Sequence, residues 1–119
     1  MVESVRCVAT CALTEHPKKS RGYVETMATM TTYFAEYVGT FFFILAIFMS
    51  GGNPLIIGAA LAIAIFFIGR ESGGHVNPAV SFAMLLKGDL NTTSFLGYVV
   101  AQLLGGASAY YAYTMTKRM

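Results

Sequence analysis

Long apolar runs constrain the fold of this chain more than any other feature. Residues 54–69, PLIIGAALAIAIFFIG, carry no charge, and residues 33–49, YFAEYVGTFFFILAIFM, are apolar except for Glu36 and Thr40. A chain of 119 residues that is 55% hydrophobic and only 12% charged is too small to hide so much apolar surface as a soluble domain. Within lipid a backbone must satisfy its own hydrogen bonds, which favours helices. The expected fold class is an all-α membrane protein.

Three of these runs are interpreted as membrane spans. The first is expected at residues 33–50 and ends at SGGN, a turn-prone cluster. The second occupies residues 54–69 and starts at a proline, which suits the first position of a helix. The third, residues 94–116, begins after hydroxyl residues that can cap a helix. Residues 1–31 are predicted to be a disordered cytoplasmic tail rather than a signal peptide, and residues 32–119 a single membrane domain.

Composition argues against several function classes. The formal charge of +2 is too small to indicate nucleic-acid binding, and the basic residues are dispersed without aromatic neighbours for stacking. Cys7 and Cys11 are interpreted as ordinary tail thiols, with palmitoylation as the alternative, and they complete neither a disulfide framework nor a thiolate metal site. The two histidines, His16 and His75, lie far apart, so no metal or cofactor is expected. No nucleophile–base pair or carboxylate pair indicates an enzyme.

A polar stretch, SGGHVNPAVS, interrupts the apolar chain between the second and third spans. From Pro78 to Lys87 a helix would be about 15 Å long at 1.5 Å per residue, which is half of the hydrocarbon thickness. Residues 72–87 are therefore predicted to be a re-entrant element, in which an extended backbone enters the membrane and returns as a half-helix. Because lipid tolerates non-helical backbone only where it is buried in protein or lines a water-filled cavity, this element indicates a pore.

The chemistry of the turn narrows the class of solute. Asn77 is expected at the N-cap of the half-helix and Pro78 at its first position, so that the positive end of the helix dipole repels cations. The Asn77 side chain can donate a hydrogen bond to a passing oxygen atom. Backbone carbonyls offer acceptors along the same path, at Gly73, Gly74 and His75. A small neutral solute fits this set of groups, whereas the Asn53-Pro54 pair is interpreted as a plain helix start.

This segment resembles the first of the two NPA boxes of the aquaporin, or major intrinsic protein, family of water and glycerol channels. The resemblance spans residues 33–115, because AEYVGT and AQLLGG resemble the family's first-helix and third-helix signatures. It implies that the box is Asn77, Pro78 and Ala79, and that the loop is braced by Glu36, His75 and Gln102. Both the amide donor and the acceptor of Gln102 need partners in lipid, and the loop backbone is expected to supply them. Two alternatives stay open from the residues alone: Glu36 could face lipid headgroups, and His75 could sense protons.

The resemblance also indicates how much of a channel this chain contains. The family's complete channel contains two inverted repeats, and this chain corresponds to one of them, with three transmembrane helices and one re-entrant half-helix. The implied function is passive conduction of water or small neutral solutes as half of a pore, with a second half-channel or a full-length aquaporin subunit as partner in a tetrameric assembly. Ile57 stands where water-selective relatives carry an aromatic residue, which argues against strict water selectivity. The alternative is a non-conducting truncated subunit that regulates the assembly of a relative.

Small residues recur every four positions in the third span and form a stripe that lets another helix approach closely: Gly97, Ala101, Gly105 and Ala109. Gly58 and Ala62 repeat this spacing in the second span. The stripe is expected to pack helices tightly. In the alternative function, it would also be the surface that binds a full-length relative.

Basic residues predict the orientation of the chain. With a cytoplasmic N-terminus the inner side would hold Arg6, Lys18, Lys19, Arg21, Arg70 and Lys87, against Lys117 and Arg118 outside. This asymmetry obeys the positive-inside rule and predicts a multi-pass integral membrane protein with its N-terminus in the cytoplasm. Translation from Met27 or Met30 would remove the tail charges and weaken the bias.

Overall fold

The computed structural model describes the backbone of residues 21–119 and the side chains from residue 29 onward. Within this part of the chain all regular structure is helical, without a strand. The helices are α2 (Arg21–Met49), α3 (Pro54–Ser72), α4 (Pro78–Lys87) and α5 (Thr92–Arg118). The predictions for Cys7, Cys11 and His16 lie outside the described residues.

Several helix bounds differ from the prediction. Helix α2 begins at Arg21, within the segment predicted to be a disordered tail, because a helix satisfies its own backbone and can extend beyond an apolar run. Helix α3 extends beyond residue 69 to Ser72 and stops at Gly73, which caps it in the left-handed conformation. Helix α4 has the length and the bounds that the sequence predicts.

Two segments are long and apolar enough to cross a membrane, Thr29–Met49 and Pro54–Ser72. Helix α5 has 27 residues and therefore sufficient length. Its glycines, hydroxyl residues and tyrosines make it less apolar than the other two. The third crossing therefore stays a prediction, and it does not follow from composition.

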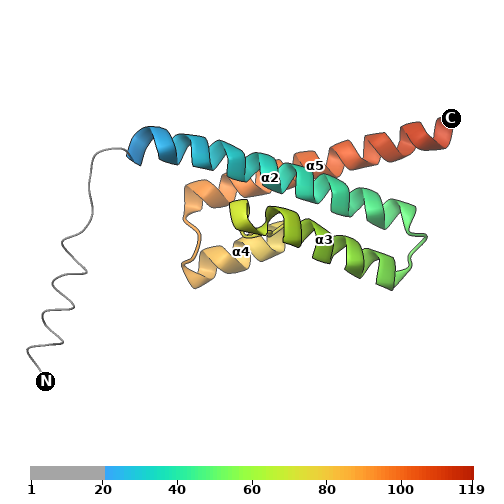
Figure 1. Ribbon diagram of the computed structural model, residues 1–119, viewed down its shortest axis with the longest axis horizontal. Helices are drawn as coiled ribbons and strands as arrows, with labels where there is room; N and C mark the ends of the chain where they lie inside the picture. The colour runs from blue at the N-terminus through green and yellow to red at the C-terminus, as the bar shows by residue number, and fades with distance from the viewer. Residues whose placement is uncertain (1–20) are drawn as a thin grey trace, which may run out of the picture.

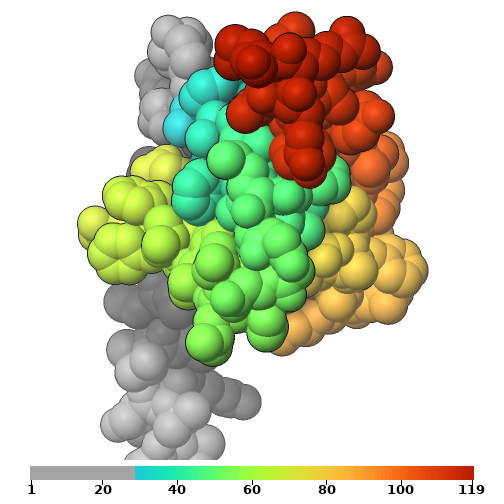
Figure 2. Space-filling view, turned by 90° about the vertical axis from the view of Figure 1, so that its right-hand side faces the viewer, coloured from blue at the N-terminus to red at the C-terminus, as the bar shows by residue number. Residues whose placement is uncertain are grey.

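Helix α2 contacts two of the other helices. It packs against α3 and α5, and α4 packs against α5 (Figure 1). The half-length α4 runs from the middle of the molecule to the end where α5 begins, so it occupies only part of the bundle's length (Figure 1). The end-on view places the later part of α3 and helix α4 on opposite flanks (Figure 2). The loop that joins them therefore crosses the middle of the bundle.

Three helices begin with an asparagine cap, which satisfies backbone N–H groups that have no partner within the helix. The Asn53 side chain accepts from Leu55 N at 3.0 Å, and the Asn91 side chain accepts from Ser94 N at 2.8 Å. Asn77 caps α4 in the same way, and a proline follows it as one follows Asn53. Local sequence therefore starts these helices, including the half-helix.

The stripe of small residues on α5 packs against α2 of the same chain. A Cβ atom on Gly105 would lie 2.5 Å from Tyr37 O, and one on Gly97 would collide with the ring of Tyr33. Ala109 is fully buried, and Ala101 is buried as well. The hypothesis that this stripe binds a second protein is wrong, because α2 already covers it.

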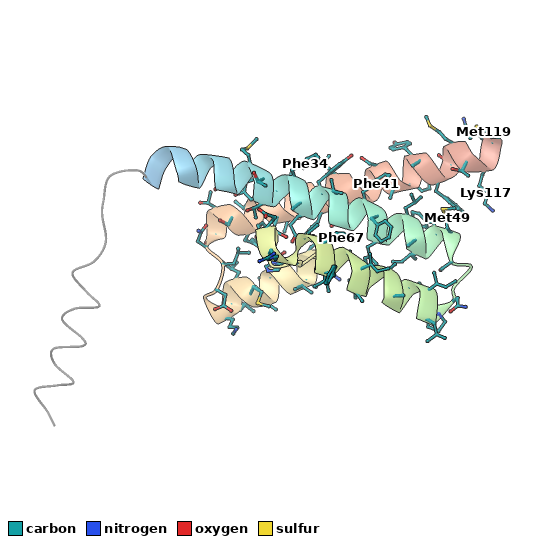
Figure 3. All side chains as sticks on the ribbon, in the orientation of Figure 1. Phe34, Phe41, Met49, Phe67, Lys117 and Met119 are labelled. Carbon is teal, nitrogen blue, oxygen red and sulfur yellow. The ribbon has the colours of Figure 1, made fainter. Side chains whose placement is uncertain are left out.

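The same spacing in α3, at Gly58 and Ala62, does not pack against another helix of the described chain. The buried face of α3 is formed by residues that include Ala60 and Ala64, whereas Ala62 is exposed and nothing lies within 4 Å of a Cβ atom placed on Gly58. Sequence spacing identifies small residues but does not select the face that a neighbouring helix covers. The outer surface of α3 is apolar, and Phe67 is 74% exposed there (Figure 3). Such a surface is suited to lipid.

Helices α2 and α5 end at the same end of the bundle, as the labelled residues Met49 and Lys117 show (Figure 3), and aromatic side chains pack together there. The ring centroids of Phe48 and Tyr113 are 5.2 Å apart, and Lys117 Nζ lies 5.5 Å from the centre of the Tyr113 ring. Aromatic and basic residues are enriched where membrane proteins meet the headgroup layer. This end of the bundle therefore has the composition of an interfacial region.

Candidate functional site

The loop between α3 and α4, residues 73–77, departs from ordinary backbone geometry. Gly73, Gly74 and Val76 have positive φ angles of 86°, 67° and 44°. A Cβ atom on Gly74 would lie 3.2 Å from Ile65 Cα, so the backbone of the loop lies close against α3. Positive φ is unusual for a β-branched residue such as Val76 and costs on the order of 1–3 kcal/mol. The surrounding contacts must therefore hold this loop in place.

Glu36 supplies the central contact. Its side chain is fully buried on α2, and its carboxylate accepts four hydrogen bonds. Oε1 accepts from Ser72 Oγ at 2.6 Å and from His75 N at 2.9 Å. Oε2 accepts from Val76 N at 2.7 Å and from Gln102 Nε2 at 3.0 Å. A buried carboxylate needs such donors, and here two of them belong to the backbone of the strained loop.

Gln102 reaches the loop indirectly. Its amide nitrogen donates to Glu36 and, at 2.9 Å, to Ser81 Oγ. The Ser81 hydroxyl also lies 3.0 Å from His75 Nδ1. The sequence argument had Gln102 bond the loop backbone through both its donor and its acceptor. The structure differs, because the donor serves two side chains and the buried Oε1 has no partner among the described residues.

Sequence reasoning missed three members of this network. Ser72 donates to Glu36 and accepts from Gly74 N at 3.2 Å, and Tyr98 OH donates to Ser72 O at 2.7 Å. Ser81 is fully buried on α4. A signal was available for each, since the two serines are the first and last residues of SGGHVNPAVS. Tyr98 lies one helical turn before Gln102, on the same face of α5.

Asn77 lies at the start of α4 and is exposed. Its Oδ1 accepts from Ala79 N at 2.8 Å, so its amide nitrogen is not used by the cap. It lines an open pocket of about 340 Å³ between α2, α4 and α5, together with Thr40, Val76, Pro78 and Gln102. Thr40 Oγ1 is buried without a partner among the described residues, as is Gln102 Oε1.

The loop carbonyls that the sequence singled out are those of residues 73–75. No group in the described part of the chain donates a hydrogen bond to them, so these acceptors stay available. Ile57 lies near the start of α3, half-buried, whereas the pocket around Asn77 is lined by residues of α2, α4, α5 and the loop. The structure therefore does not bring Ile57 into contact with Asn77, and its role in selectivity stays a prediction.

Ionisable side chains are scarce around this site. Between residues 29 and 119, no three His, Cys, Asp or Glu side chains gather in a position to hold a metal ion. At the exposed end of α4, Lys87 Nζ donates to Asp89 Oδ2 at 2.6 Å, and this hydrogen bond raises the pKa of Lys87. Both side chains are exposed, so the pair adds little to the stability of the site.

Comparison with known proteins identifies the family of the chain. The family model for major intrinsic proteins matches residues 23–118. The chain is 36% identical over 88 residues to glycerol uptake facilitator protein-like 6 of Lactiplantibacillus plantarum, which covers 67% of this chain and 41% of that relative. It is 44% identical over 66 residues to the lens fiber major intrinsic protein of Gallus gallus, covering 53% of this chain and 25% of the relative.

A third relative, aquaporin-8 of Rattus norvegicus, is 51% identical over 49 residues, which cover 41% of this chain and 19% of the relative. The chain thus spans less than half of the length of these three relatives. The family match nevertheless extends over most of the chain and includes all four helices. The chain therefore belongs to the major intrinsic protein family, a family of integral membrane channels for water and glycerol rather than of enzymes.

Proposed function

We propose that the chain is half of a passive transmembrane channel for water or small neutral solutes such as glycerol. The observation that carries this proposal is the position of Asn77, at the N-terminus of a half-length helix and on the wall of a pocket of about 340 Å³. Its amide can donate to a solute, and the free carbonyls of residues 73–75 can accept from one. The positive end of the α4 dipole disfavours cations at the same point.

Two polar residues at the same pocket support the proposal that the chain pairs with a second half-channel. Thr40 and Gln102 line the pocket, and their Oγ1 and Oε1 atoms are buried without a hydrogen-bond partner among the described residues, at about 1–3 kcal/mol each. A complementary half-channel that packs against this pocket and reorients the two side chains would give these atoms partners and remove that cost. The proposed partner is a second half-channel or a full-length aquaporin subunit, in a tetrameric assembly when the channel is complete.

In this proposal α2, α3 and α5 cross the bilayer, and α4 enters it from the cytoplasmic side. Arg70 and Lys87 lie at the ends of α3 and α4, and the α4 end is near the start of α5 (Figure 1). These residues add to the positive charge on the side of a cytoplasmic N-terminus, with Lys117 and Arg118 opposite. A homodimeric pore would need both orientations, because the two halves of such a pore are inverted. The chain alone is therefore not expected to conduct.

A swelling assay in proteoliposomes tests the proposal. The chain is reconstituted alone and together with the C-terminal half of the glycerol uptake facilitator-like relative, under an osmotic gradient of sucrose for water and of glycerol for solute entry. We expect permeability above the lipid background only for the pair. If the pair assembles but stays at background, the channel reading is refuted and the non-conducting subunit reading is favoured.

Two matched variants identify the conducting element. Asn77→Asp keeps a cap acceptor for Ala79 N, so α4 should fold, but it places a negative charge in the path and removes the amide donor. We expect the permeability of the pair to fall. Asn53→Asp makes the same change at the Asn-Pro cap of α3 and should leave permeability unchanged. An equal loss in both variants would mean that the effect comes from capping and not from a path at Asn77.

A further inference from the structure

The Ser81 hydroxyl lies between two side chains of the loop-bracing network. Ser81 is fully buried on α4, and its Oγ is 2.9 Å from Gln102 Nε2 and 3.0 Å from His75 Nδ1. No other side-chain or backbone group in the described chain bonds this hydroxyl. Gln102, Ser81 and His75 thus form a row of hydrogen-bonded side chains. Whether His75 Nδ1 donates or accepts depends on the positions of the protons in this row.

The position of the amide protons on Gln102 follows from Glu36. The carboxylate can only accept, so the atom of Gln102 that lies 3.0 Å from Glu36 Oε2 must be the amide nitrogen and not the oxygen. The nitrogen carries two hydrogens. One points to Glu36, and the other points to Ser81 Oγ at 2.9 Å. Ser81 is therefore an acceptor in its contact with Gln102.

The Ser81 hydrogen then has one remaining partner. If Ser81 donates to His75 Nδ1, the Ser81 hydroxyl is satisfied as donor and acceptor: Gln102 donates to Ser81, and Ser81 donates to the ring. If Nδ1 carried a proton instead, Ser81 Oγ would accept twice and its own hydrogen would stay without a partner in a fully buried place. A buried donor without an acceptor is disfavoured.

We infer that Ser81 is a positioning residue that sets the tautomer of the neutral His75 ring and keeps its proton on Nε2. The ring lies against Tyr98 of α5, at 4.9 Å between centroids, and Glu36 of α2 binds the His75 backbone. Tyr98 and Glu36 are thus the ionisable groups that pack around the loop. Arg70 and Glu71, at the end of α3, are exposed. Neither Tyr98 nor Glu36 forms a described hydrogen bond with the imidazole, so Ser81 decides its tautomer.

The tautomer determines whether His75 Nε2, which lies outside the hydrogen-bond network, is a donor or an acceptor. A Cβ atom on Gly73 would lie 3.3 Å from His75 Nε2, so this nitrogen faces the exposed start of the loop. With its proton on Nε2, His75 offers a hydrogen-bond donor there, and the lone pair of the ring lies on Nδ1, where it accepts from Ser81. The neutral ring therefore presents a donor at the start of the loop.

Nitrogen-15 NMR of the full chain in detergent micelles tests this inference directly. His16→Asn leaves His75 as the single histidine, and selective labelling then reports both ring nitrogens above the pH at which the imidazole is neutral. We expect one-bond coupling to hydrogen at Nε2 and none at Nδ1. Coupling at Nδ1 in the otherwise unchanged protein would overturn the inference, whatever the variants do.

Three variants separate the hydroxyl from the packing. Ser81→Ala should abolish the preference, so that both tautomers appear, and Ser81→Thr should restore it because the hydroxyl is kept. Ser72→Ala removes a different hydroxyl from Glu36 without contacting the ring and should leave the tautomer unchanged. An unchanged Nε2 preference in folded Ser81→Ala, or an equal loss in Ser72→Ala, would show that Ser81 does not set the ring.

Discussion

Glu36 gives the most direct test of how the loop is held. Its carboxylate accepts from His75 N and Val76 N, and these N–H groups have no other acceptor among the described residues. Ser72 Oγ keeps a second acceptor, because it also lies 3.3 Å from Ile68 O, whereas the Gln102 hydrogen that points to Glu36 has no other acceptor among the described residues. The cost of replacing Glu36 is therefore governed by three N–H groups, two of the loop backbone and one of Gln102.

The size of the effect follows from counting those groups. Glutamine has one oxygen, so in Glu36→Gln either the His75 or the Val76 N–H meets an amide nitrogen and loses its acceptor, at about 1–3 kcal/mol. Glu36→Leu leaves the His75, Val76 and Gln102 N–H groups unpaired, at about 3–9 kcal/mol. Removing the charge also relieves the desolvation of the carboxylate, which moves both values toward the lower part of their ranges. We expect leucine to cost at least about twice as much as glutamine.

Unfolding of the chain in mixed micelles by sodium dodecyl sulfate measures these differences. Glu71→Gln is the control, because it replaces an exposed carboxylate and should change the free energy of unfolding by less than about 0.5 kcal/mol. If the Gln and Leu variants at residue 36 are equally stable, or both match the parent, the carboxylate does not hold the loop. The hydrogen-bond argument would then be refuted.

The remaining predictions concern packing and one buried hydroxyl, and the same unfolding assay measures them. Gly105→Ala should cost on the order of 1–3 kcal/mol, because its Cβ would meet backbone atoms of α2. Gly106→Ala is the control, because the nearest atom to its Cβ is 4.0 Å away. It should be neutral or stabilising by up to about 1 kcal/mol. Gly74→Ala should cost more than Gly51→Ala, since both have positive φ but only Gly74 also lies against α3; equal losses would contradict this packing. Thr40→Val should stabilise the isolated chain by roughly 1 kcal/mol, because it removes a buried hydroxyl without a partner, and it should weaken pairing with a complementary half.

The sequence by itself determined the helical fold class and the bounds of the half-helix. Uncharged apolar runs must form helices in lipid, and asparagine, proline and glycine mark where those helices start and stop. Helix α4 begins at Pro78 after an Asn77 cap and ends before Gly88, which are all local features. The same stretch carried the resemblance that the family match later confirmed. Local chemistry was sufficient for these predictions because each depends on neighbours within a few residues.

The tertiary structure decided which groups meet. The bonds from Ser72 and Gln102 to Glu36 join residues that lie 36 and 66 positions apart, and no local pattern specifies such pairs. The structure also selected the face of α3 that packs and gave Val76 its positive φ. These features depend on how three helices close around one buried carboxylate. The Glu36 carboxylate finds enough hydrogen-bond donors only when distant segments converge. The sequence alone could therefore identify Glu36 as a buried polar residue but not its complete set of partners.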